Sequence, residues 1–295
     1  MSFFAATNPC PCESGLEYDQ CCANPENKPI LFSQINQHGE SDSPLTTELE
    51  TAIQNFCTRP DLFPVNIDTL NNSSELAKMS PFWFSESVFL DSPRIMGKCR
   101  LTANLHWIKK QADNIDYQTT PYIFHTAFCG STLISKALEL THHCLPIREP
   151  DLLAVLLNYS YSENTFPEIE SQWYTRITNL LSRRFEPDVP AVIKANDYAN
   201  PILHKILEYR PQTPVLLMYI PLQQFVASCV KIDSRKQWIQ DRIRANYYRF
   251  MPALQVPEEQ INFDQDIGKL AAVYWCYSIY LFQTAIENYG DHIKT

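Results

Sequence analysis

An alternation between apolar runs and helical segments is the feature that most constrains how this chain can fold. Residues 121–231 contain four short apolar runs, each followed by a segment with helical spacing: PYIFH, the run that ends in CLPIREP, PAVIKAND and TPVLLMYI. Such a succession is typical of an α/β fold with a mostly parallel sheet. Ligands of such sheets bind beyond the carboxyl ends of the strands, so we expect the loops after these runs to carry a site.

Composition and charge narrow the set of partners. A chain of 295 residues with 45% hydrophobic content can bury a large core. The formal net charge of -9 disfavours broad electrostatic binding to nucleic acid or anionic lipid, which depends on clustered Lys and Arg. The longest apolar stretch, residues 270–282, is shorter than the ~20 residues that cross a bilayer, and it predicts a buried helix. The N-terminus MSFFAATNP lacks the pattern of a secretory signal, so we expect a cytoplasmic protein without nucleic-acid or membrane partners.

The N-terminal stretch NPCPCESGLEYDQCC concentrates four of the ten cysteines. One residue separates Cys10 from Cys12, while Cys21 and Cys22 are adjacent. The turn signal ESG between the two pairs allows the chain to fold back and bring them together. Disulfides are not expected in a reducing compartment, and four thiolates suffice for one tetrahedral zinc ion. The spacing therefore favours a zinc site over the alternative of unrelated cysteines.

This stretch resembles the SEC-C zinc motif, with Pro11, Ser14, Gly15 and Tyr18 at the positions of the motif. The resemblance implies a structural zinc ion held by the four cysteines and a role in protein contacts, not in catalysis. Where many members carry Lys-Lys, this chain has Leu16-Glu17, and Asp19 adds a second acid. We therefore expect that any protein partner presents a basic surface.

The loop TAFCGST, which follows the first apolar run, combines a glycine with two hydroxyls. Gly130 lets backbone N–H groups point into a concavity, and Ser131 and Thr132 stand at the N-terminus of the next helix, where the helix dipole favours a phosphate. The loop is not a Walker A motif, and no arginine follows Cys129 at the spacing of a cysteine phosphatase. On spacing alone, a helix N-cap without a ligand is the simpler interpretation.

A wider resemblance favours the phosphate site. Together with IREP, VIKAND, LLMYIPLQQFVAS and KLAAVYWCYSIYLF, the loop resembles the sulfotransferase superfamily and its bacterial P-loop relatives over about residues 118–295. The resemblance implies a three-layer P-loop-type domain and phosphoadenosine phosphosulfate as donor. Gly130, Ser131 and Thr132 would bind its 5′-phosphate, and Ser228 would contact its 3′-phosphate.

Three positions depart from the family pattern. Phe128 replaces the cation of the first loop, Ile220 replaces an arginine of the 3′-phosphate segment, and Asn196 replaces the catalytic histidine of the cytosolic branch. Lys194 would then supply positive charge, and Glu149 would be the base, as a glutamate is in several branches. Capping of the following helix is an equally good role for Glu149.

Other polar residues in this part of the chain have simpler interpretations. We expect His125 to be a hydrogen-bonded residue at a strand end. Arg242, Arg244 and Arg249 fit an exposed helical face, with a cationic lid as the alternative.

We expect three regions: a zinc motif at residues 1–27, a linker and partly helical lead-in at 28–115, and a P-loop-type domain at 116–295. In the lead-in, the spacing of Leu49, Ile53 and Phe56 and the segment 101–112 predict helices. The expected function is sulfuryl transfer to an unidentified hydroxyl acceptor. The alternatives are a nucleotide-binding phosphotransfer relative and a non-catalytic adaptor that docks a protein partner through its zinc motif.

Overall fold

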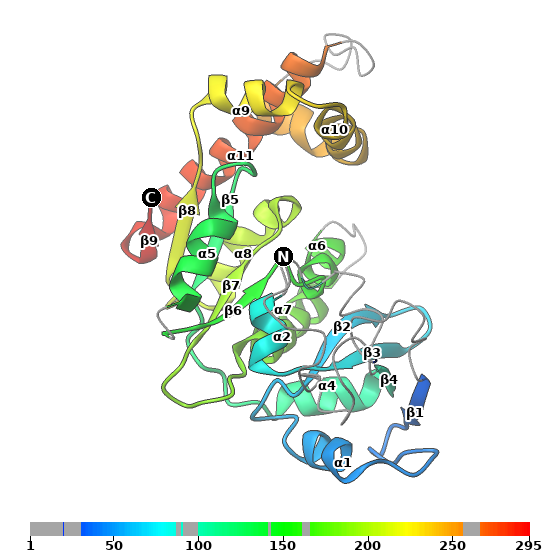
Figure 1. Cartoon of the computed structure of the whole chain (residues 1–295). Helices are drawn as coiled ribbons and strands as arrows, with labels where there is room; N and C mark the ends of the chain where they lie inside the picture. The colour runs from blue at the N-terminus through cyan, green and yellow to red at the C-terminus, as the bar shows by residue number, and fades with distance from the viewer. Residues whose placement is uncertain are drawn as a thin grey trace. The chain divides into compact units, whose positions relative to one another are not determined.

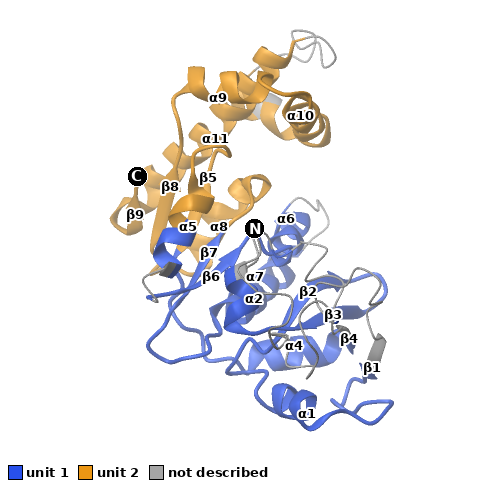
Figure 2. Cartoon of the chain, viewed as in Figure 1, with its two compact units in different colours: residues 1–121, 135–194 blue, residues 122–134, 195–295 orange. Residues whose placement is uncertain are grey.

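The computed structural model describes residues 20, 31–86, 90, 100–140, 143–160, 166–255 and 266–295 (Figure 1). The chain divides into two compact units, unit 1 with Met1–Pro121 and Ser135–Lys194, and unit 2 with Tyr122–Ile134 and Ala195–Thr295 (Figure 2). The chain therefore passes from unit 1 to unit 2 and back before it enters unit 2 a second time.

Unit 1 consists mainly of elements from the first two thirds of the chain. They are β1 (Leu31–Ile35), α1 (Thr47–Gln54), β2 (Leu62–Asp68), β3 (Ser73–Lys78), α2 (Pro81–Glu86), β4 (Arg100–Asn104), α4 (Leu105–Asp113), β6 (Leu145–Arg148), α6 (Leu152–Ser160), α7 (Pro167–Ser182) and β7 (Ala191–Lys194). Helix α5 (Ser131–Leu140) begins in unit 2 and continues into unit 1.

Unit 2 holds one early strand and the last part of the chain. Its elements are β5 (Tyr122–His125), the 3-10 helix η1 (Asp197–Ile202), α8 (Leu203–Tyr209), β8 (Val215–Met218), α9 (Leu222–Val230), α10 (Asp233–Leu254), α11 (Ile267–Tyr289), the 3-10 helix η3 (Gly290–His292) and β9 (Ile293–Lys294). Figure 1 shows α9, α10 and α11 gathered together.

The prediction of an α/β fold with a mostly parallel sheet is confirmed. The four apolar runs form β5, β6, β7 and β8, and the expected helices follow each of them. Together with β9 they make a five-stranded sheet in the order β6-β7-β5-β8-β9, and the pairs β5–β8, β6–β7 and β8–β9 are parallel. All four residues of β5, β6 and β7 are buried, which explains why these strands appear as continuous apolar runs.

The lead-in contains a sheet that the sequence did not predict. Four strands pair in the order β1-β4-β3-β2, and β3 pairs antiparallel with both β2 and β4. The central strand β3 reads SSELAK, a composition with low strand propensity, so its conformation depends on its two neighbours.

The helix predicted at residues 101–112 starts later than expected. Strand β4 ends at Asn104, whose side chain accepts the backbone N–H of His106 at 2.9 Å and so caps α4. The helix expected from Leu49, Ile53 and Phe56 is present as α1.

Helix α5 presents a different face from the one that its apolar spacing indicates. The side chains of Leu133 and Leu138 are 72% and 40% exposed, whereas Ser131 and Ser135 are buried. Ser135 is buried because its hydroxyl accepts a hydrogen bond at 3.1 Å from Nε of the buried Arg148. The need of a buried cation for an acceptor therefore outweighs the apolar pattern here.

The predicted buried helix is the centre of the core of unit 2. Helix α11 places Leu270, Ala271 and Tyr274 against apolar residues of α9 and α10, among them Phe225 and Ile239. None of the described helices combines the length and apolar character that a membrane span requires.

Candidate functional site

The loop between β5 and α5 has an unusual backbone. Ala127 and Phe128 adopt φ angles of 64° and 52°, and Gly130 follows with 83°. Side chains disfavour this left-handed region, which costs about 1–3 kcal/mol for a residue other than glycine. The carbonyl of Gly130 accepts the N–H of Ile134 at 3.1 Å, so α5 begins immediately after the loop. The predicted phosphate-binding residues Gly130, Ser131 and Thr132 thus lie where a strained loop meets a helix N-terminus.

His125 anchors the start of this loop. Its Nδ1 atom accepts the N–H of Ala127 at 3.0 Å, so the proton of the neutral ring must lie on Nε2. Nε2 lies 2.9 Å from the carbonyl oxygen of Ala195, to which it donates. Both ring nitrogens therefore have structural partners, and the prediction of a hydrogen-bonded strand-end histidine is confirmed.

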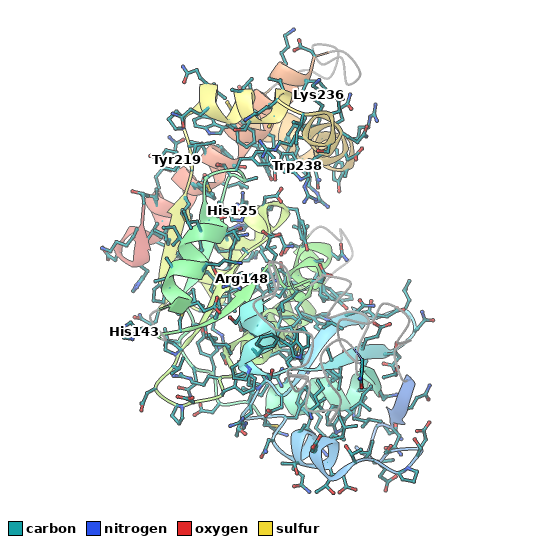
Figure 3. All side chains as sticks on the ribbon, in the orientation of Figure 1. His125, His143, Arg148, Tyr219, Lys236 and Trp238 are labelled. Carbon is teal, nitrogen blue, oxygen red and sulfur yellow. The ribbon has the colours of Figure 1, made fainter. Side chains whose placement is uncertain are left out.

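A guanidinium from α10 lies over the loop where the sequence pattern lacks a cation. The central carbon of the Arg235 guanidinium is 4.6 Å from the centroid of the Phe128 ring, and Nη1 donates to the carbonyl of Ser228 at 3.2 Å. The Phe128 ring also packs against Trp238, with ring centroids 5.0 Å apart, and Figure 3 shows Trp238 on α10. In the described part of the chain no carboxylate forms an ion pair with Arg235. The sequence did not indicate Arg235, because only the folded structure brings this residue close to Phe128.

Ser228 lies next to this cation, but the bonded atom is its backbone carbonyl. Its hydroxyl was predicted to contact a 3′-phosphate, and that role stays a prediction. The structure brings Ser228 and Phe128 together through Arg235.

The thiol of Cys129 is not an activated nucleophile. Burial raises the pKa of Cys129 above its ordinary value, although hydrogen bonds from the backbone and hydroxyl of Ser131 act in the opposite direction. The thiol is therefore protonated at neutral pH.

A buried cluster links η1 to α10 and α11. The guanidinium of Arg242 contacts both carboxylate oxygens of Asp197 at 3.1 Å, and the Tyr274 hydroxyl donates to the same carboxylate. Burial acts to lower the pKa of Arg242, but the Asp197 carboxylate, its hydrogen bond and the nearby Tyr274 and Tyr198 together outweigh burial and raise that pKa. Arg242 therefore neither belongs to an exposed helical face nor provides a free lid cation.

The two predicted catalytic residues lie together in unit 1. Lys194 is the last residue of β7 and is 1% exposed, while Glu149 follows β6 with a φ angle of 52°. The Lys194 ammonium forms an ion pair with the Glu149 carboxylate, and the Glu149 N–H donates to the Lys194 carbonyl at 2.6 Å. Each charge thus has an opposite charge beside it. The catalytic roles of Lys194 and Glu149 stay predictions.

The predicted zinc ligands Cys10, Cys12, Cys21 and Cys22 lie outside the described residues. Within the described ranges, no group of His, Cys, Asp or Glu side chains is arranged to hold a metal ion. The zinc ion stays a prediction.

The fold defines an α/β protein with a five-stranded parallel sheet. Residues 7–24 match the SEC-C motif, which confirms the motif that the cysteine-rich stretch resembles. This match includes all four predicted zinc ligands and extends over the N-terminal segment only. A comparison with curated proteins finds no match.

Proposed function

We propose that this chain is a sulfotransferase-like protein in which the loop 126–132 binds the 5′-phosphate of phosphoadenosine phosphosulfate. One observation carries the proposal, the combination of a left-handed loop at a helix N-terminus with a guanidinium that no carboxylate of the described residues neutralises. The loop would offer backbone N–H groups and the hydroxyls of Ser131 and Thr132. Arg235 would supply the positive charge that Phe128 lacks, and Ser228 lies beside it.

The reaction would join the sulfuryl group to an acceptor hydroxyl. The acceptor oxygen forms a new S–O bond as the S–O bond to the donor phosphate breaks, and adenosine 3′,5′-bisphosphate leaves. Glu149 would take the proton of the hydroxyl, and Lys194 would stabilise the charge on the leaving oxygen. Because these two side chains form an ion pair, the proposal requires that the pair opens when donor and acceptor bind.

The SEC-C match supports an additional role in docking. The four cysteines would hold a structural zinc ion, and Glu17 and Asp19 would favour a basic surface on a protein partner. An adaptor would use this role alone, without donor binding by unit 2.

Calorimetric titration with adenosine 3′,5′-bisphosphate tests the donor site. We expect micromolar binding by the wild-type protein and binding about 10- to 100-fold weaker by Arg235→Gln, because a charge-assisted hydrogen bond contributes about 1.5–3 kcal/mol. Lys236→Gln is the matched control, since it removes a positive charge from the next position of α10, where Lys236 pairs with Asp233 at 2.8 Å. No binding at millimolar ligand would overturn the proposal, and a preference for ATP with magnesium would favour a phosphotransfer relative.

Elemental analysis of protein purified without added metal tests the zinc site. We expect about one zinc ion per chain, and its loss when both Cys10 and Cys12 are replaced by serine. Replacement of Cys276, an exposed free cysteine of α11, by serine is the control and should retain the metal. Metal-free wild-type protein with a fully folded N-terminal segment would contradict the zinc proposal.

A further inference from the structure

A pocket in unit 1 has a composition that the proposed donor site does not explain. It has a volume of about 420 Å³, within the size range of small-molecule sites. The segment after α1, the segment after α4 and the C-terminal end of α7 surround it. Ile115, Phe185 and Pro187 give it apolar walls, and its charged lining residues are Arg59, Asp116, Arg183 and Arg184.

The pocket carries an excess of positive charge. Nε of Arg59 lies 2.8 Å from the carboxylate of Asp61, which neutralises this guanidinium. Arg183 and Arg184 form no ion pair with any described carboxylate, and Asp116 is the acid among the described lining residues. In a chain with a formal net charge of -9, a pocket with this excess selects anions.

Arg183 is the central cation of the pocket. Its residue is 2% exposed, Nε donates to the Leu180 carbonyl at 3.0 Å, and Nη1 donates to the carbonyls of Phe56 at 2.8 Å and Leu62 at 3.1 Å. These bonds connect the end of α7 to the segment after α1 and so stabilise the fold. The remaining nitrogen of the guanidinium, Nη2, is buried and has no hydrogen-bond acceptor.

Backbone carbonyls and the Phe56 ring, whose centroid lies 4.5 Å from the guanidinium carbon, compensate the buried charge of Arg183 only in part. Burial lowers the pKa of Arg183 to about 9, because carbonyl oxygens replace only part of the lost hydration. An anion in the pocket would offset this cost through its attraction to the Arg183 charge. Arg184, whose Nη2 donates to the Gln118 side chain at 2.8 Å, would provide a second cation at the pocket wall.

We propose that this pocket binds an organic carboxylate with an aromatic or other apolar body. The Arg184 guanidinium would donate to the acid group, and the buried positive charge of Arg183 would add to the attraction. The walls formed by Ile115, Phe185 and Pro187 would contact the body of the ligand. The site is independent of the proposed donor site, because it lies entirely in unit 1 and shares no residue with it.

Fluorine NMR with 4-fluorobenzoate tests the proposal on the full chain. We expect saturable binding with a Kd of about 1 mM, which is reasonable for a ligand of this size. The neutral isostere 4-fluorobenzamide should bind at least tenfold more weakly. Equal binding of the acid and the amide would overturn the proposal. So would the absence of saturable binding at an acid concentration of about 20 mM.

The variant Arg184→Gln tests whether the ligand binds in this pocket, and it leaves the hydrogen bonds from Arg183 to backbone carbonyls intact. We expect 4-fluorobenzoate to bind this variant at least tenfold more weakly. Arg176→Gln is the matched control, because Arg176 lies on α7 shortly before Arg184 in the chain but pairs with Asp113 at 2.8 Å and does not line the pocket. An unchanged affinity in Arg184→Gln, or an equal loss in Arg176→Gln, would contradict the assignment.

Discussion

The positively charged side chains of unit 1 and unit 2 differ in their surroundings. Unit 1 buries Arg148 and Lys194, each 1% exposed, and pairs them with Glu139 and Glu149. Arg148 also donates to the carbonyls of Phe84 and Ser85 at 3.0 Å. In unit 2, Arg235 lies over the Phe128 ring without a carboxylate partner among the described residues, whereas Arg242 lies over Tyr198 at 5.0 Å and also contacts the Asp197 carboxylate.

This difference separates cations that stabilise the fold from cations that can bind a ligand. A buried cation beside a carboxylate has its charge compensated, and either partner alone would be costly. A guanidinium on an aromatic face keeps donors for an incoming anion. Arg235 in unit 2 has this second character. In unit 1, Arg183 is buried, lies 4.5 Å from the centroid of the Phe56 ring and forms no ion pair with a described carboxylate.

The largest effect is expected from Glu149→Gln. This change leaves the buried Lys194 ammonium without its carboxylate and should lower the free energy of unfolding by about 3–5 kcal/mol. Urea unfolding at pH 7 measures it. Glu208→Gln breaks the more exposed pair of Lys205 and Glu208 in unit 2 and should cost less than about 1 kcal/mol. Equal losses in the two variants would erase the contrast between the units.

Tyr274→Phe is expected to have the next largest effect. It removes the hydroxyl that donates to the buried Asp197 carboxylate, and hydrogen bonds to charged groups contribute about 1.5–3 kcal/mol. Urea unfolding should show a loss in this range. A neutral result would indicate that Arg242 alone satisfies Asp197.

The loss caused by Tyr274→Phe should also depend on pH. Burial raises the pKa of Tyr274 well above its ordinary value, so the unfolded chain releases this proton first as the pH rises. The contribution of Tyr274 is therefore complete below about pH 10, the unfolded value, and falls above it. Unfolding of both proteins at pH 8 and pH 10.5 should show a smaller difference at the higher pH.

Gly130→Ala should have a moderate effect that comes from the backbone alone. An added Cβ atom would meet nothing within 4 Å, but the φ angle of 83° is strained for alanine. We expect a loss of about 1–2 kcal/mol. Gly290→Ala is the control, because its surroundings are equally open and its φ angle of -53° suits any residue. A cost as large at Gly290 would rule out backbone strain as the cause.

Arg235→Gln should change stability least. Its ring contact with Phe128 is partly exposed, and such contacts contribute about 0.5–1 kcal/mol. The variant should therefore unfold within about 1 kcal/mol of the wild-type protein, while its binding of adenosine 3′,5′-bisphosphate weakens strongly. A large loss of stability would place Arg235 with the structural cations of unit 1.

The sequence predicted the elements whose signal is local. Strands β5 to β8 follow from apolar runs bounded by turn residues, because a buried parallel strand needs apolar side chains on both faces. The position of Gly130 in a loop between a strand and a helix, and the hydrogen-bonded position of His125 at a strand end, were also predicted. The sheet of the lead-in was not, because Glu75 and Lys78 give β3 little intrinsic preference for a strand.

By itself, the sequence determined the α/β class, the SEC-C motif and the position of the loop after β5. Tertiary structure alone decided the ion pair of Lys194 with Glu149, the cluster of Asp197 with Arg242, and the placement of Arg235 over Phe128. The physical reason is the distance along the chain between the residues that interact. Backbone conformation and apolar periodicity depend on neighbours within a few residues, whereas a charge finds its partner only when distant segments have packed together.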